Sequence, residues 1–202
     1  MSNIDEKIAK LKLQQRIDKE EEERLKNEPI VNEKEITLEE VCEGIKNGEV
    51  IINDKKFIFT KKVFYDGKFE LPVPESFFEV KVNTDKNLVL VNNLQGISFN
   101  GNYINQCTKK QNFNTIKSAI QKNFKETKIY MEWIEEGKFK LGDSTVFFAT
   151  YKTPTAKGQL YNLVFFRDYK GTVSIGNYNC FYKDIKEWEL LIKASVKLMR
   201  FI

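Results

Sequence analysis

The end of this chain reads TVFFATYK (Thr145–Lys152), LYNLVFFR (Leu160–Arg167), TVSI (Thr172–Ile175) and then KDIKEWELLIKASVKLMRF (Lys183–Phe201). The first three stretches are rich in β-branched and aromatic residues and are joined by short polar loops, which predicts neighbouring antiparallel strands. The fourth repeats apolar residues at every third or fourth position, which predicts an amphipathic helix. We therefore expect a sheet with one face covered by the last helix.

Upstream of this ending, the sequence predicts a second helix and a series of short strands. Asn114–Phe124 is expected to be helical because Ile116, Ile120 and Phe124 fall on one face. Further strands are expected at residues 49–53, 56–60, 62–65, 68–71, 77–82, 88–91, 97–99, 128–134 and 138–141. Tight turns are expected at Asp66-Gly67, Asn100-Gly101 and Glu136-Gly137. Strands in runs, with helices placed apart, predict the α+β class: an antiparallel β-sheet sandwiched by helices.

The first 35 residues are expected to form a charged helical tail ahead of this sheet. Ile4, Ile8 and Leu11 share one face of that helix, which makes them candidate contacts for a partner protein. Two interpretations stay open. The segment is either a solvated, partly frayed helix in the free protein or a docking helix that becomes ordered in an assembly.

Residues 36–61 are expected to extend the main domain by one capped helix and one hairpin. Thr37 and Glu40 stand at the spacing of a capping box, and Gly48 supplies the helix stop. The hairpin follows directly. Residues 62–202 are then expected to form the α+β domain itself.

The chain contains no histidine, and this absence narrows the possible chemistry more than any residue that is present. Ser-His-Asp and Cys-His catalysis are excluded, as are most metalloenzyme sites. Cys42, Cys107 and Cys180 lie far apart and are expected to be small apolar residues, partly buried. Carboxylates, lysines and tyrosines form no recognisable catalytic set. We therefore expect a protein that is not an enzyme and that holds no metal or cofactor.

Charge and hydropathy limit the partners and the location. The 33 basic and 29 acidic residues give a net charge of +4, which is too even for the basic face of a nucleic-acid-binding protein. The sequence starts without the apolar stretch of a signal peptide, and no run reaches the roughly 18 apolar residues of a membrane helix. We expect no nucleic-acid partner, no membrane span and a cytoplasmic location.

The order of the expected elements resembles the PsbP-like α/β/α sandwich superfamily. Tyr65–Pro72 (YDGKFELP) looks like that family's opening hairpin, and Phe113–Phe124 would be its first helix. Trp188–Phe201 is similar to the closing helix, including its apolar-basic-Phe ending Met199-Arg200-Phe201. The resemblance covers about residues 62–202. The superfamily includes photosystem oxygen-evolving subunits, a Ran-binding nuclear import factor and the Eag chaperones of type VI secretion.

This resemblance implies a function in binding rather than in catalysis, because the family has no common active site and its members mostly bind other proteins. We expect a non-enzymatic protein-binding domain, a chaperone or adaptor for a secreted toxin or secretion system. An alternative is a structural subunit of a phage-tail-like or injection assembly. The partner would be another protein, a secreted effector or an assembly subunit, and the oligomeric state stays open.

A partner would need a surface to bind, and the sequence offers two possibilities. An open sheet face could form a groove for an apolar partner segment. Candidate contacts on that face are Tyr151, Tyr161, Phe166 and Tyr178, for which a place in the core is the alternative. A small-ligand binder or an unrecognised hydrolase would instead require a deep pocket with convergent polar groups.

Overall fold

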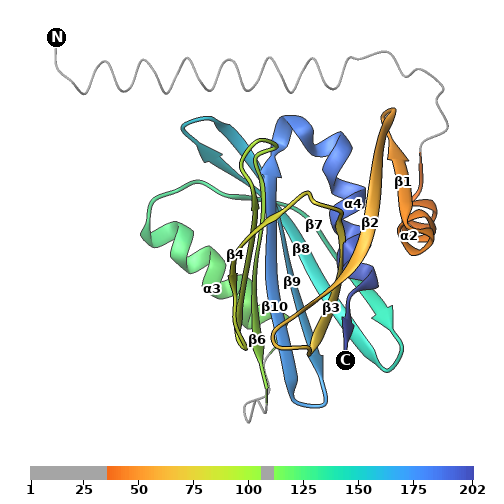
Figure 1. Cartoon of the computed structure of the whole chain (residues 1–202). Coiled ribbons are helices and arrows are strands. Elements are labelled where there is room, and N and C mark those ends of the chain that lie inside the picture. Colours follow the sequence, from red (N-terminus) through yellow and green to blue (C-terminus); the bar gives the residue numbers. More distant parts are fainter. Residues whose placement is uncertain (1–35, 106–111) are drawn as a thin grey trace.

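Two antiparallel sheets and three α-helices form the fold in the computed structural model of the chain, which describes residues 36–105 and 112–202 (Figure 1). The helices are α2 (Leu38–Asn47), α3 (Phe113–Glu126) and α4 (Ile185–Leu198), with a 3₁₀ turn, η1 (Tyr182–Asp184), before α4. The strands are β1 (Glu49–Ile52), β2 (Lys55–Phe64), β3 (Phe69–Pro74), β4 (Glu79–Asn83), β5 (Asn87–Asn92), β6 (Ile97–Ile104), β7 (Glu132–Leu141), β8 (Ser144–Thr155), β9 (Gly158–Tyr169), β10 (Thr172–Phe181) and β11 (Arg200–Phe201). The expectations for the N-terminal helix, with Ile4, Ile8 and Leu11, and for Cys107 lie outside the described residues.

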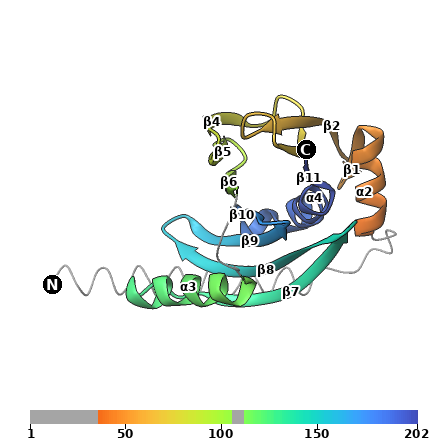
Figure 2. The same ribbon diagram turned by 90° about the horizontal axis from the view of Figure 1, so that it is seen from below.

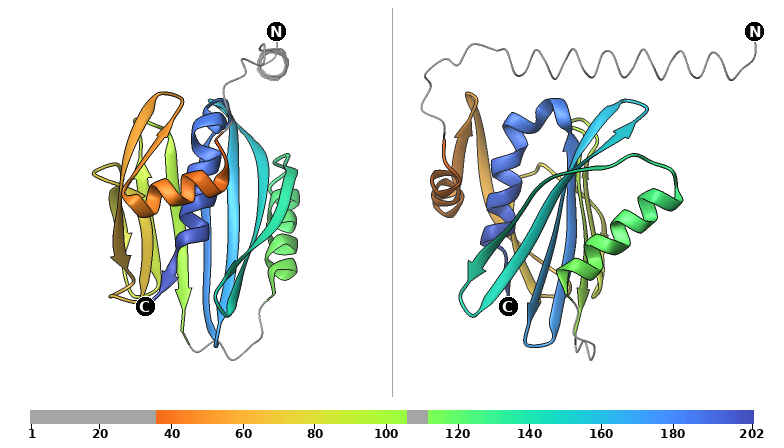
Figure 3. Two further views of the ribbon diagram at one scale, coloured as in Figure 1. Left: turned by 90° about the vertical axis from the view of Figure 1, so that its right-hand side faces the viewer. Right: turned by 180° about the vertical axis from the view of Figure 1, so that it is seen from behind.

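The larger sheet bends around α4, and the smaller sheet closes the opposite side (Figure 2). The larger sheet has the strand order β4-β5-β6-β10-β9-β8-β7, and the smaller one has the order β1-β2-β3-β11. In Figure 3, α2 lies beside α4, and α3 lies on the outer face of the larger sheet. The expected α+β class is confirmed. Among the described residues, no helix is long and apolar enough to cross a membrane.

Helix α4 supplies the centre of the core, because its apolar stripe meets both sheets. Trp188 is 2% exposed, with the rings of Phe57 and Phe77 at centroid distances of 5.4 and 5.2 Å. Leu191, Ile192 and other residues of the same stripe are buried with it. The stripe expected from the sequence is therefore correct, but the helix is enclosed between two sheets instead of lying on one.

The sequence predicted a helix that continues to Phe201, but the helix ends earlier. Helix α4 ends at Leu198, and Met199 adopts an extended backbone with φ −61° and ψ 150°. Arg200 and Phe201 then pair with β3 as a short edge strand, β11. The Phe201 ring gains aromatic neighbours there, including Phe69 at 5.8 Å, which a continued helix would not reach. This exchange of helix for strand creates one wall of the pocket described below.

Helix α2 forms where the sequence predicted it and belongs to the same core. The Glu40 N–H donates to Thr37 Oγ1 at 3.2 Å, and the Thr37 N–H donates to Glu40 Oε2 at 2.8 Å, which completes the capping box. Cys42 is buried against the core, as expected, and so is Cys180. The expected boundary between residues 61 and 62 falls inside β2, so the structure shows no break there.

Two expected turns, Asn100-Gly101 and Glu136-Gly137, are instead the middles of strands β6 and β7. In both places glycine makes room for an aromatic side chain on the sheet. A Cβ at Gly101 would lie 2.4 Å from the Tyr65 hydroxyl, and one at Gly137 would lie 2.4 Å from the Phe148 ring. Gly176 in β10 is covered by Phe165 in the same way. These glycines therefore mark close packing within a strand, which their sequence neighbours do not distinguish from a turn.

Replacement of Gly137 by alanine tests this explanation. The added methyl group has to displace the Phe148 ring, which stacks on Phe139 at 4.7 Å, so we expect a loss of about 1–3 kcal/mol in chemical denaturation. In a Phe148→Leu background the ring is absent, and the same alanine change should cost much less. An equal loss in both backgrounds would contradict the explanation.

Candidate functional site

The four aromatic residues expected on an open sheet face are all buried. Tyr161 and Tyr178, at 0% and 2% exposure, lie in the main core. Tyr151 and Phe166, at 6% and 3%, lie outside that core. Tyr151 packs beside Phe124 of α3, at a ring distance of 5.8 Å. Tyr161 and Tyr178 thus take the alternative place in the core, and α3 packs on Tyr151, while a role of these residues as partner contacts stays a prediction.

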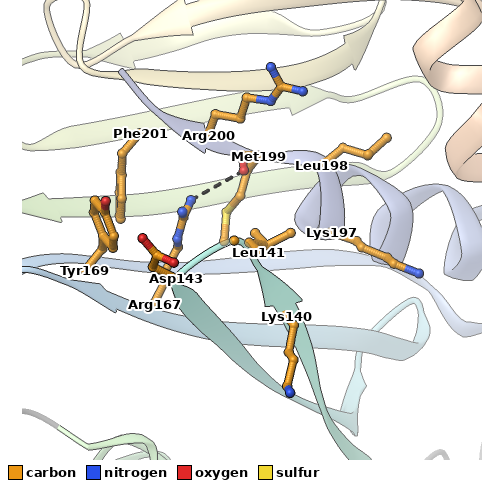
Figure 4. A pocket seen from close by; sticks show the side chains of 11 residues that line it. Lys140, Leu141, Asp143, Arg167, Tyr169, Lys197, Leu198, Met199, Arg200 and Phe201 are labelled. Carbon is orange, nitrogen blue, oxygen red and sulfur yellow. Dashed lines mark hydrogen bonds between the residues drawn. The ribbon is translucent and has the colours of Figure 1, made fainter.

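A pocket of about 550 Å³ opens where α4 ends, between the two sheets (Figure 4). Its walls come from the tip of the β7–β8 hairpin, from the end of β9 and from the segment that joins α4 to β11. The residues that line it are Lys140, Leu141, Gly142, Asp143, Arg167, Tyr169, Lys197, Leu198, Met199, Arg200 and Phe201. We call it the Arg167 pocket.

Arg167 is only 7% exposed, although its side chain is charged. Its Nε donates to Ser144 Oγ at 2.9 Å, and its Nη1 donates to the Met199 carbonyl oxygen at 3.4 Å. The Ser144 hydroxyl is fixed in turn, because it donates to the Leu141 carbonyl at 3.1 Å. The guanidinium also lies 4.3 Å from the centre of the Phe201 ring. These contacts hold the group in one orientation at the base of the pocket.

The guanidinium keeps unused hydrogen-bonding capacity. It carries five N–H donors, and the two hydrogen bonds above account for two of them. Among residues 36–105 and 112–202, no carboxylate lies within ion-pairing distance of it, although Asp143 lines the same pocket. Burial lowers the pKa of Arg167, an effect that Tyr169 partly opposes. An arginine nevertheless remains charged at neutral pH, so the pocket holds a buried cation that no carboxylate of the described residues pairs with.

The other charged groups surround the pocket at its rim. Figure 4 shows Lys140, Lys197 and Arg200 pointing away from Arg167 in different directions. Lys197 is engaged with Glu39 of α2 at 2.8 Å, whereas Lys140 and Arg200 are exposed. Asp143 also lines the pocket, so three cationic side chains besides Arg167 stand against one carboxylate, a balance that attracts an anion over a distance.

The remaining wall is apolar. Leu141 and Leu198 are half-buried, Met199 is 1% exposed, and the rings of Tyr169 and Phe201 stack at 6.3 Å. A site of this kind can bind an anionic group that is attached to an apolar body. The described residues that line it include no nucleophile with an activating base. Within the described residues, no group of three or more Cys, Asp or Glu side chains could hold a metal ion.

A second hollow of about 600 Å³ lies beside the start of α3. Phe166 lines it together with Phe113 and Phe147, whose rings stack at 6.2 Å. Of the four aromatic candidate contacts, Phe166 is thus the one that lines either pocket, but the residue is only 3% exposed. Among the described residues, no buried unpaired charge points into this hollow. It therefore offers a ligand no charged anchor comparable to Arg167.

The Arg167 pocket could not be found from the sequence. A signal did exist, because Leu163 and Phe165 face the core from β9 and Arg167 follows in the same alternation. However, β9 is buried on both faces through most of its length, so its sequence does not reveal which residues face inward. In addition, the sequence predicted a helix through Phe201, so it did not predict strand β11, which forms one wall of the pocket.

Comparison with known proteins shows a similarity in fold and none in sequence. No family model matches the sequence, and no curated protein does. The structure is similar to the solution structure of cyanobacterial PsbP (CyanoP) from Synechocystis sp. PCC 6803, with a TM-score of 0.57 and 7% sequence identity. The match covers 71% of this chain and 92% of that one. The fold is PsbP-like.

The PsbP-like fold was expected from the sequence, and a second solved structure gives it no further support. The match to PA94 of Pseudomonas aeruginosa, described as a protein of unknown function and putative regulator, has a TM-score of only 0.40 at 11% identity. It covers 69% of this chain and 94% of that one. Neither match is close enough in sequence to carry a function, and the resemblance to Eag chaperones stays a prediction.

Proposed function

We propose that this protein is a non-enzymatic binding domain that holds another protein through the Arg167 pocket. The observation that carries the proposal is the buried Arg167 guanidinium, which faces an open pocket without a carboxylate partner in the part of the chain that the structure describes. A buried charge without a counter-ion is costly in a free protein. Such a charge is useful where a partner supplies the missing anion.

The surroundings of Arg167 favour a protein partner over a small metabolite. The pocket is open, and the guanidinium of Arg167 is its one buried cation among the described residues, while Lys140, Lys197 and Arg200 point away from it. A small-ligand site usually encloses its ligand and aims several polar groups at it. One anchor within a wider cationic and apolar surface is more typical of the point where a protein chain inserts one residue.

The finer form of the proposal is an adaptor or chaperone for a secreted effector in the cytoplasm. It is supported by the resemblance to a superfamily that includes secretion chaperones. The rival function, a subunit of an injection assembly, depends on residues 1–35, which lie outside the described residues. We favour the adaptor because the Arg167 pocket lies in the described domain and does not require that segment.

Site-specific photo-cross-linking in cells tests the proposed function. We expect a cross-linking amino acid in place of Lys140, at the pocket rim, to capture a stoichiometric protein partner. The matched control is Lys125, an exposed lysine on α3, which lies on the opposite side of the molecule from β11 (Figure 2). No adduct at position 140, or the same adducts from both positions, would count against binding through this pocket.

A further inference from the structure

The Arg167 pocket borders a sheet edge that no further strand of the described residues covers. Strand β11 is the last strand of the smaller sheet, and both of its residues, Arg200 and Phe201, line the pocket. A strand at an edge leaves backbone N–H and C=O groups unpaired, and an extended peptide can satisfy them by adding another strand. The pocket and the edge are therefore available to one and the same ligand.

The register shows which backbone groups face this ligand. The Ile202 N–H donates to the Lys68 carbonyl of the β3 side at 3.0 Å, and Phe201 pairs with Phe69. Because successive residues of a strand point their backbone groups to alternate sides, the N–H and C=O of Phe201 point away from β3. The Met199 carbonyl, two residues earlier, accepts from Arg167. The free edge of β11 thus faces the same side as the guanidinium.

The chemistry at the base of the pocket selects a carboxylate. Arg167 keeps donors on Nη1 and Nη2, and this pair matches the two oxygens of a carboxylate. A phosphate site would bring several donors together, whereas Lys140 and Arg200 point away from Arg167. The apolar wall beside Arg167 suits an apolar side chain next to the carboxylate.

We infer that the Arg167 pocket binds the C-terminal carboxylate of a partner protein, whose last residues add to the edge of β11 as an extended strand. This inference rests on the protein-binding function proposed above. A C-terminal residue is the one place in a protein where a carboxylate, an apolar side chain and an extended backbone meet within one residue. An internal Asp or Glu carries its carboxylate on the side chain and leaves the apolar wall uncovered.

Three peptides test this inference by calorimetric titration of the full chain. The first is acetyl-Ala-Val-Ala-Leu with a free C-terminal carboxylate. The second is the same peptide with a C-terminal amide, and the third is the amide with glutamate in place of leucine. We expect the free acid to bind at least tenfold more tightly than either amide. In Arg167→Lys, which keeps the charge and loses the planar fork, this preference should disappear. In Lys125→Glu it should be unchanged.

Equal binding of the free acid and the leucine amide would overturn the inference, and so would the tightest binding by the glutamate peptide. These results are distinguishable from a failure of the proposed function. If position 140 cross-links a partner but the free acid has no advantage, only the C-terminal carboxylate is wrong. If position 140 captures nothing, the protein-binding function itself fails.

Discussion

Replacement of Arg167 by methionine is expected to abolish the preference for a free carboxylate and, at the same time, to leave the protein as stable as before or more stable by about 1 kcal/mol. Methionine has a similar length and no charge, so it removes the cost of burying a guanidinium that has no carboxylate partner among the described residues. Two hydrogen bonds are lost, of which the one to the Met199 carbonyl is long at 3.4 Å. A gain in stability coupled to a loss of binding is typical of a functional residue.

The measurement combines urea denaturation with titration of the free-acid peptide, on wild type and on Arg167→Met. Ser144→Ala is the matched control, because it removes the contact to Nε and leaves the guanidinium in place. We expect that control to weaken peptide binding less than Arg167→Met does. A loss of stability above about 2 kcal/mol in Arg167→Met, with peptide binding intact, would assign Arg167 a structural role at the end of α4.

Raising the pH above about 10 is expected to unfold the protein, because four buried tyrosines lose their protons far more easily in the unfolded chain. Burial raises the pKa of Tyr151 to about 12, and it raises the pKa values of Tyr65, Tyr161 and Tyr178 further. A raised pKa favours the neutral, folded form, so this contribution to stability is complete below pH 10 and falls as the pH rises. Each tyrosine lowers the free energy of unfolding by about 1.4 kcal/mol per pH unit above that value.

Four such groups together remove about 5 kcal/mol per pH unit, which is enough to unfold a domain of ordinary stability within one or two units. Tyrosinate absorbance and circular dichroism, followed on the same samples, check this prediction. A buried tyrosine ionises only when the protein unfolds. We therefore expect Tyr178→Phe to reduce the tyrosinate absorbance that appears together with unfolding, and to leave the absorbance that appears before unfolding unchanged. The exposed Tyr130 supplies the control substitution. Ionisation of Tyr178 while the circular dichroism is still native would show that it is not buried.

The elements that the sequence predicted well are those with a local physical cause. The capping box of Thr37 and Glu40 needs only residues three positions apart. The stripe of α4 around Trp188 needs only a helical period. The antiparallel strands from residue 145 onward follow from apolar runs and short loops. The class of the fold could be inferred from such signals because each of them acts within a few residues.

The parts that the sequence did not predict depend on contacts between distant segments. The sequence around Gly137 is typical of a turn, and only the contact with the Phe148 ring of the next strand explains why this glycine lies within a strand. Phe201 continues the helical pattern of α4, yet it pairs with Phe69 of β3. Arg167 becomes buried beside a pocket only because β9, the β7–β8 hairpin and the segment after α4 pack together. The candidate site therefore lies where tertiary packing overrides local preference.

The same packing explains why the aromatic candidate contacts are buried. Tyr161 and Tyr178 were candidate contacts because aromatic residues on a sheet face suit either a core or a groove. The structure places both in the core, and α3 lies over the outer face near Tyr151. Which sheet face is covered depends on the paths of α3 and α4, and the sequence pattern of a single strand contains no information on those paths.

The central claim is that the free N–H groups of Arg167 bind a carboxylate, and NMR of the arginine side chains tests it most directly. The guanidinium signals of Arg167, assigned by their loss in Arg167→Met, are followed while the free-acid peptide is added. We predict that they shift and that their N–H exchange with water slows, whereas the amide peptide leaves them unchanged. Arg167 signals that do not respond while the free-acid peptide binds elsewhere on the protein would contradict the claim.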